Sequence, residues 1–328
     1  MKVRLKNFIV LIVLCMFVTG CYLIRGNIND VKVQELGSYA FGLLHGDSGV
    51  ISQFKYDGEE IRIAYYVEGR AEGVVSEFAW FAFVDGLPQP TQLEFESGEI
   101  IRQIDYMHQF GLEFGERLEF YIVFTPVSGE NGETVDFIVA SLLQPDYLPE
   151  SRDEPIFGVF HTLGARFPEE ILINDRIQNT LSNYTNIQLI EVPQNLIDEE
   201  HSFSLEDVSR LKWSPRIEIL PAEADLQINY EDLIVANNGY VQIQLLLYGG
   251  PEAVSRITFF VNHQPVAVNG VDFIEIQMES GQMALVQVEL TLTELNDFNS
   301  LYAIVAMPNI DHIVPGIFKT QTLLLVSQ

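Results

Sequence analysis

Histidines and carboxylates are the residue types in this sequence that could carry acid–base or metal chemistry. The six histidines include no close pair, which a metal site built from neighbouring residues would need. Acidic residues often stand side by side, as in Glu59-Glu60, Glu169-Glu170 and Glu199-Glu200, but adjacent residues of a strand point to opposite faces. Glycoside hydrolysis needs two carboxyl groups roughly 5–10 Å apart across one cleft. We therefore expect no catalytic residue, no metal ligand and no cofactor.

Nucleophile motifs are equally scarce. The Gly-x-Ser-x-Gly elbow, the phosphate-binding loop and the His-Glu-x-x-His helix are absent from the sequence. Gly46-Asp-Ser-Gly49 resembles the nucleophile loop of trypsin-like proteases, but of the histidines only His45 precedes Ser48. A loop of turn-forming residues is the better interpretation. His45 and His161 stand at equivalent positions of a weak internal sequence repeat. They are the one histidine pair whose positions in the structure are worth comparing.

The two tryptophans have different surroundings. Trp80 lies in the run Phe78–Val84, which is apolar throughout, so we expect it in a core; an exposed platform for sugar stacking is the alternative. Trp213 directly precedes Ser214-Pro215 at the end of an element, where an aromatic side chain can stay partly exposed. Trp213 is therefore the candidate binding residue.

The cysteines suggest covalent attachment. Three basic residues stand among the first six, and an apolar run follows from Phe8 to Val18. A basic head, a short apolar segment and small residues at a cut site are the parts of a secretory signal. Val18-Thr19-Gly20-Cys21 resembles the lipobox of bacterial lipoproteins. The resemblance implies cleavage after Gly20 and a diacylglycerol thioether on Cys21.

This resemblance places the protein on the extracytoplasmic face of the cell membrane, with membrane lipid as its partner through Cys21. The alternative is an uncleaved membrane helix from Phe8 to Ile24, which just reaches the lower limit of about 17 residues for crossing a bilayer. Either way, the rest of the chain lies outside the cytoplasm. Since Cys15 would be removed with residues 1–20, we expect a mature chain with neither a free thiol nor a disulfide.

Charge and composition narrow the function further. The formal net charge is −28, so the chain repels phosphate backbones and we exclude nucleic acid as a partner. The apolar content of 48% argues against disorder.

Short apolar runs separated by turns predict a β-sandwich over residues 39–150. Ile61–Val67 alternates apolar and polar residues over its first half, whereas Phe78–Val84 is typical of a central strand buried on both sides. Asp57-Gly58 predicts a hairpin between Ile51–Tyr56 and Ile61–Val67. The remaining runs are Ile100–Tyr106, Leu118–Phe124 and Val135–Leu143.

Residues 216–328 repeat this order and are interpreted as a second copy. Phe83-Val84-Asp85 aligns with Phe260-Val261-Asn262, inside the longer match of residues 80–88 with 257–265. The other matches are Val241–Tyr248 with Ile61–Val67, Leu285–Leu292 with Leu118–Phe124, and Leu301–Pro308 with Phe137–Pro145.

Residues 151–215 are the least strand-like part, and we expect a linker or insertion with short helices. Ile173, Ile177 and Leu181 have helical spacing, and Ser204-Leu-Glu-Asp207 can cap a second helix. The fold class is thus all-β, with two tandem sandwiches joined by a partly helical linker. Trp80 on a middle strand resembles the core of immunoglobulin-like domains. The expected parts are a signal peptide at 1–20, a tether at 21–38, sandwiches at 39–150 and 216–328, and the linker at 151–215.

The combined reading is a non-enzymatic, lipid-anchored binding or scaffolding module whose partner is a cell-surface or wall protein or glycan. Two alternatives remain open. One is a carbohydrate-active or wall-processing enzyme on an all-β scaffold, and the other is a secretion or folding accessory that adds a client strand to a sheet edge. Fold alone does not decide between them.

Overall fold

Alternating burial in strand β3 (Ile61–Gly69) illustrates how this chain folds. Ile61, Ile63, Tyr65 and Val67 are all buried, while the residues between them are more open. Because successive side chains of a strand point to opposite faces, one face of β3 enters a core and the other faces water. The expected alternation is confirmed.

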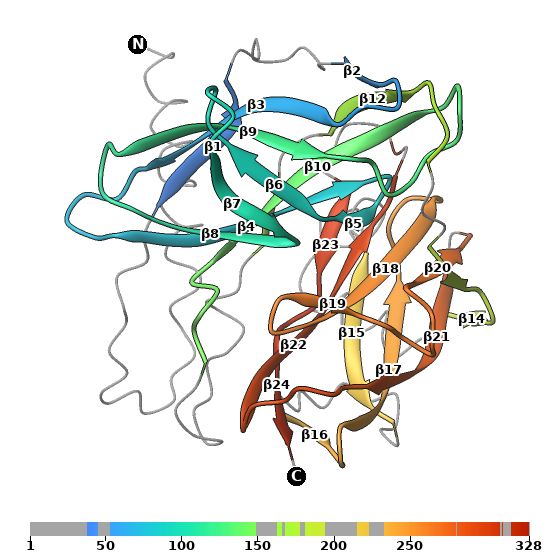
Figure 1. Cartoon of the computed structure of the whole chain (residues 1–328). Helices are drawn as coiled ribbons and strands as arrows, with labels where there is room; N and C mark the ends of the chain where they lie inside the picture. The colour runs from blue at the N-terminus through green and yellow to red at the C-terminus, as the bar shows by residue number, and fades with distance from the viewer. Residues whose placement is uncertain are drawn as a thin grey trace, which may run out of the picture. The chain divides into compact units, whose positions relative to one another are not determined.

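The computed structural model describes residues 38–44, 53–148, 163–165, 168–177, 181–193, 215–222, 233–279, 281–308, 310 and 316–327. These residues lie in one compact unit and form strands joined by turns and loops (Figure 1). Across the described ranges, no helix has the length and apolar character needed to cross a membrane.

Two sheets form the first sandwich. The first has the order β1 (Tyr39–Leu43), β3, β9 (Arg117–Phe124), β6 (Thr91–Glu94), β7 (Ile100–Asp105). The second has the order β2 (Gln53–Tyr56), β12 (Glu169–Ile173), β10 (Thr134–Leu143), β4 (Ser76–Val84), β5 (Leu87–Gln89), with β11 (Leu163–Ala165) on β10 and β8 (Met107–Leu112) on β4. Their facing sides share one apolar core, in which Trp80 is fully buried and stacks on Phe120 with ring centroids 6.1 Å apart. The expectation that Trp80 belongs to a core is confirmed.

Two further sheets form the second sandwich around a core of their own. One has the order β13 (Asn183–Tyr184), β20 (Phe273–Gln277), β18 (Val254–Val261), β22 (Phe298–Ala306), β24 (Leu323–Ser327), β16 (Leu233–Ala236), with β19 (Gln264–Val266) on β18 and β23 (Ile317–Lys319) on β22. The other has the order β14 (Gln188–Glu191), β21 (Gln282–Thr291), β17 (Tyr240–Tyr248), β15 (Arg216–Pro221).

The strands that the sequence matches pair in the same way in both sandwiches. β3 pairs with β9 as β17 pairs with β21, and β4 pairs with β10 as β18 pairs with β22. Even the parallel pair recurs, as β2 with β12 and as β16 with β24. The repeated order of apolar runs therefore reflects a repeated topology.

The described part of residues 151–215 forms strands joined by loops. The helix predicted from the spacing of Ile173, Ile177 and Leu181 is therefore wrong. Ile171 and Ile173 are two residues apart and both enter the first core, which a strand achieves and a helix does not. β11 and β12 join the first sandwich, whereas β13 and β14 join the second. The capped helix expected after Ser204 lies outside the described residues.

The hairpin expected at Asp57-Gly58 is also wrong, because β2 and β3 lie in different sheets. The turn carries the chain from one sheet to the other. It packs on the loop after β12, where the Asn174 side-chain amide donates to Asp57 Oδ1 at 2.7 Å. Gly58 has a φ of 91°, which favours glycine, whereas the exposed Asp175 side chain beside it can move to admit a Cβ.

The strands that are apolar on both faces have a second packing partner. Even-numbered residues of β4 face the first core, while Phe81 and Phe83 face the other way and pack against Phe260 and Tyr302. We call this contact between the two sandwiches the seam. It consists of Phe81, Phe83, Ile138, Ala140 and Leu142 from the first sandwich and Phe260, Tyr302, Ile304, Ala306 and Ile317 from the second.

Candidate functional site: a pocket at the seam

Two hairpins frame a small pocket beside the seam. Asp85-Gly86 joins β4 to β5, and Asn262-His263 joins β18 to β19 at the aligned position. All four residues have positive φ, between 48° and 75°, which is the backbone of a tight two-residue hairpin turn. Leu87 and Pro88, which follow the first turn, line one side of the pocket. Pro265 and Val266, which follow the second turn, line the other side.

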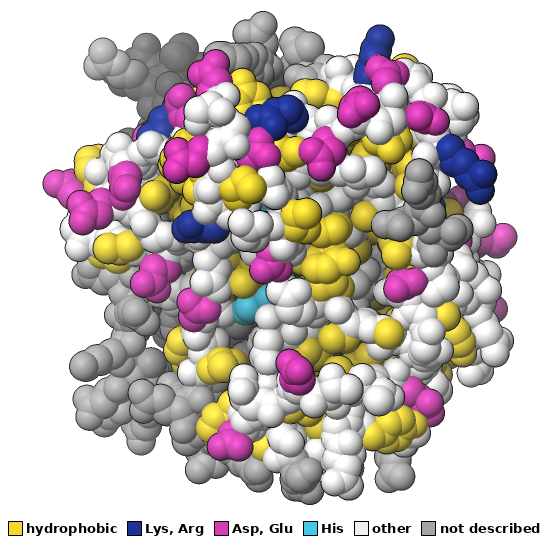
Figure 2. Space-filling model, viewed as in Figure 1, with side chains coloured by type: hydrophobic (Ala, Val, Ile, Leu, Met, Phe, Trp, Pro, Cys, Tyr) yellow, Lys and Arg dark blue, Asp and Glu magenta, His cyan; other side chains and the backbone are white. Residues whose placement is uncertain are grey.

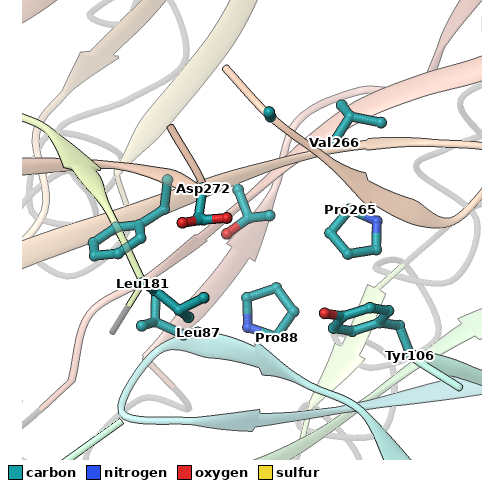
Figure 3. Close-up of a pocket in the computed structure, with 10 residues that line it drawn as sticks. Leu87, Pro88, Tyr106, Leu181, Pro265, Val266 and Asp272 are labelled. Atoms are coloured by element: carbon teal, nitrogen blue, oxygen red, sulfur yellow. The ribbon is translucent and has the colours of Figure 1, made fainter. Parts of the chain in front are cut away.

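The pocket has a volume of about 130 Å³. Polar and apolar surface contribute to its walls in nearly equal parts, and Figure 3 shows Pro88, Pro265, Tyr106 and Asp272 turned toward the same space. The residues that line it are Leu87, Pro88, Tyr106, Leu181, Thr258, Pro265, Val266, Ala267, Asp272 and Phe273. A concave site in which polar groups converge among apolar side chains can hold a small ligand.

Thr258 explains why a hollow exists here. In the aligned first sandwich its position is held by Phe81, which fills the seam and packs edge-on against Phe260 with ring centroids 5.8 Å apart. Threonine is much smaller than phenylalanine, so the second sandwich leaves space where the first fills it. The Thr258 side chain is 3% exposed, and its hydroxyl has no hydrogen-bond partner among the described residues. The hydroxyl is covered by the surrounding atoms, so Thr258 contributes to the pocket through its small size.

Asp272 supplies the one carboxylate among the described residues that line the pocket. Its Oδ2 accepts the Ser182 backbone N–H at 2.7 Å and the Ser182 hydroxyl at 2.8 Å. These bonds fix the direction of the carboxylate, and within the described ranges Oδ1 receives no donor. Asp272 is itself exposed, so its charge faces both the pocket and water.

Tyr106 places a phenol near this carboxylate. Asp105 Oδ1 accepts the Tyr106 backbone N–H at 2.6 Å and the Gln264 side-chain amide at 3.0 Å, which ties Tyr106 to the hairpin of the second sandwich. Burial, and then the negative charge of Asp272, raise the pKa of the Tyr106 hydroxyl. The phenol therefore stays protonated near neutral pH.

Polar contacts across the seam hold the two hairpins in place. Arg256 of β18 forms an ion pair with the Asp85 carboxylate and also donates to the Asp85 carbonyl. Glu275 binds the other side of the same guanidinium at 3.0 Å. His263 Nε2 lies 2.6 Å from the Pro145 carbonyl, and its Nδ1 lies 3.0 Å from the Tyr302 hydroxyl. The pocket is thus built on a fixed frame.

The sequence contains other candidate residues. Cys21, Trp213, Ser48, His45 and His161 lie outside the described residues. Of the histidines in the described ranges, His108 is buried beside Trp80 and His263 is buried in the seam. Within those same ranges no group of three His, Cys, Asp or Glu side chains is placed to hold a metal ion.

The residues that line the pocket were missed by sequence reasoning. A signal for Thr258 was present, because the alignment of residues 80–88 with 257–265 sets it against Phe81. Nothing in the sequence near Tyr106 or Asp272 indicates that they line one pocket, since packing between the two sandwiches brings them to it.

Comparison with known proteins adds likeness in fold alone. No protein-family model and no curated protein matches the sequence. Among solved structures, a PapD-like domain of human CEP192 matches at 11% identity and a TM-score of 0.22, covering 46% of this chain and 94% of that one. A chicken T-cell receptor structure matches at 11% identity and a TM-score of 0.22, covering 88% and 99%. The CBD12 structure of CALX1.2 matches at 7% identity and a TM-score of 0.17, covering 83% and 81%.

These scores are low, so the assignment of an all-β, two-sandwich fold rests on the sheets and cores described above. No property of these proteins is carried over to this chain.

Proposed function

We propose that this protein is a lipid-anchored, extracytoplasmic binding module made of two immunoglobulin-like sandwiches, with the pocket beside the seam as its binding site. The observation that carries the binding role is that both sandwiches contribute walls to one pocket. The anchoring role is supported by the lipobox at Val18-Thr19-Gly20-Cys21.

The acidic surface fits a module that works outside the cell. Figure 2 shows many acidic and few basic side chains on the face in view, and the whole chain has 46 acidic against 18 basic residues. Such an excess keeps the protein soluble and repels anionic lipid surfaces, so that membrane attachment depends on the anchor. Two buried acyl chains suffice, since each buried methylene contributes about 0.8 kcal/mol.

The carbohydrate-active alternative needs a second carboxylate across a cleft from the first. The described lining of the pocket supplies Asp272 alone. A binding role requires only the shape and the polar groups that the pocket offers, and we therefore place it first.

Membrane fractionation of a bacterial host expressing the full chain tests the anchor. Wild type should sediment with membranes, and mass spectrometry should find a lipidated N-terminal Cys21. Cys21→Ser should be released or remain uncut. Cys15→Ser is the matched control, because it changes a cysteine within the segment to be removed, and it should behave as wild type. Membrane-bound Cys21→Ser at mature size would contradict the proposal.

A further inference from the structure

The polar groups of the pocket share one chemical character, since none carries positive charge. Tyr106 offers a hydroxyl oxygen, and Asp272 offers a carboxylate oxygen that receives no donor from the described residues. The described residues that line the pocket include no Lys, Arg or His. This set accepts hydrogen bonds from a ligand and attracts a cation.

The surroundings strengthen the negative character of the site. Arg256 lies on the same strand as Thr258, but its charge is bound by both Asp85 and Glu275. Together with Asp272, the side chains of Arg256, Asp85 and Glu275 carry one positive and three negative charges. An anionic ligand would therefore meet repulsion, whereas a cationic ligand would be attracted.

The apolar walls limit the size of the ligand. Pro88, Pro265 and Leu181 offer hydrocarbon surface around the polar groups. A volume of about 130 Å³ corresponds to about four water molecules at roughly 30 Å³ each. A short alkyl chain with a terminal nitrogen fits this space, whereas drug-sized ligands need pockets of about 300 Å³ or more.

We propose that the pocket binds an alkylammonium group, either a free short-chain amine or the side chain of a lysine in a partner. The ammonium would lie against Asp272 Oδ1 and the Tyr106 hydroxyl, and its alkyl stem would pack on the two prolines. This inference rests on the proposed binding function and names its ligand class.

Titration of the isotope-labelled mature chain by NMR tests the proposal. The probes are n-butylammonium and Nα-acetyl-lysine N-methylamide, and the controls are 1-butanol, butyrate and Nα-acetyl-norleucine N-methylamide. The amide signals of Leu87, Thr258 and Asp272 should shift saturably with the two amines. For so small a ligand we expect a Kd on the order of 1 mM, at least tenfold lower than for the neutral and anionic controls.

The two amine probes distinguish the source of the ligand. Equal affinities would indicate that the alkylammonium group alone is recognised, as for a free amine. Tighter binding of the lysine derivative would indicate a lysine presented by a protein partner. Either result supports the proposal.

Variants assign the affinity to the named groups. Asp272→Asn should weaken amine binding at least tenfold, because it removes the charge and keeps an oxygen for Ser182. Thr258→Val keeps the shape of the hollow and should bind as wild type, because the hydroxyl that it removes is covered. Thr258→Phe copies the residue of the first sandwich and should abolish binding by filling the hollow. Glu96→Gln is the control, since it makes the same charge change at an exposed position outside the pocket, and it should bind as wild type.

Two results would overturn the inference, with different consequences. If 1-butanol or butyrate shifts the pocket signals as strongly as butylammonium, or if Asp272→Asn binds unchanged, the ligand class is wrong while the binding function stands. If no probe shifts Leu87, Thr258 or Asp272, the pocket binds no alkylammonium group. The anchoring result with Cys21→Ser is independent of both outcomes.

Discussion

Arg256 and Asp85 join the two sandwiches through one guanidinium, which binds both the carboxylate and the backbone carbonyl of Asp85. The Asp85 side chain is 6% exposed, so water screens the pair only weakly. Ser128 donates to the same carboxylate at 2.7 Å. The pair fixes the first hairpin against β18 and thereby the shape of the pocket.

Arg256→Met should lower the free energy of unfolding by about 3–5 kcal/mol, because it leaves the buried Asp85 carboxylate without its cation. Urea denaturation measures the change. Arg117→Met is the matched control, since Arg117 pairs with Glu119 at 2.8 Å on the surface and should cost less than about 1 kcal/mol. Equal effects of the two substitutions would contradict a seam held by Arg256.

His263 combines an unfavourable backbone with a favourable contact. Its φ of 67° suits glycine, which stands at the aligned position 86. Its two ring nitrogens nevertheless contact Pro145 and Tyr302 across the seam. We expect both His263→Ala and His263→Gly to lower stability, with the glycine variant more stable than the alanine variant by about 1 kcal/mol. Thermal unfolding measures the order, and an alanine variant as stable as the glycine variant would show that the backbone carries no strain.

His108 should make the first sandwich sensitive to acid. The ring is buried against Trp80, its Nε2 contacts the Thr91 carbonyl at 2.9 Å, and burial lowers its pKa to about 4. Because the unfolded chain takes up this proton near pH 6.5 and the folded chain only near pH 4, stability falls as the pH drops through this range.

The size of this loss follows from the pKa difference. At about 1.4 kcal/mol per unit, His108 accounts for about 3 kcal/mol between pH 6.5 and 4. His108→Gln should therefore show a shallower decline of the free energy of unfolding in urea titrations over this range. An unchanged slope would mean that His108 is protonated equally in both states.

Lys319 predicts a dependence in the alkaline range. Its ammonium donates to Thr322 Oγ1 at 2.6 Å and lies 4.6 Å from the centroid of the Tyr302 ring, and desolvation lowers its pKa to about 7. Between pH 7 and 10.5 the unfolded chain keeps this proton and the folded chain releases it, so stability rises with pH. Lys319→Met should remove this rise. The test is the urea midpoint measured from pH 7 to 10, and a variant that retains the wild-type slope would contradict it.

The predictability of this fold differed between local and long-range features. Phe78–Val84 was recognisable as a strand buried on both sides, because every residue in it is apolar. The turn Asp57-Gly58 was recognisable as a turn, but which strands it joins depends on β12, more than a hundred residues away. The spacing of Ile173, Ile177 and Leu181 fits a helix, but the spacing of Ile171 and Ile173 fits a strand equally well. The segment forms a strand because it pairs with both β2 and β10 in the sheet.

The site was less predictable than the fold. Its position depends on a difference between the repeats, a threonine set against Phe81, and on Tyr106 and Asp272 meeting across the seam. Sequence patterns report burial and periodicity, whereas such a meeting is fixed only when four sheets are packed.

The most direct test of the central claim, that both sandwiches build one binding site, is an NMR titration of the mature chain in lipid nanodiscs with n-butylammonium. We predict that signals of Leu87 on the first hairpin and Val266 on the second shift together, with one common Kd, and that Thr258→Phe abolishes both responses. Shifts confined to one hairpin, or two different Kd values, would contradict the claim.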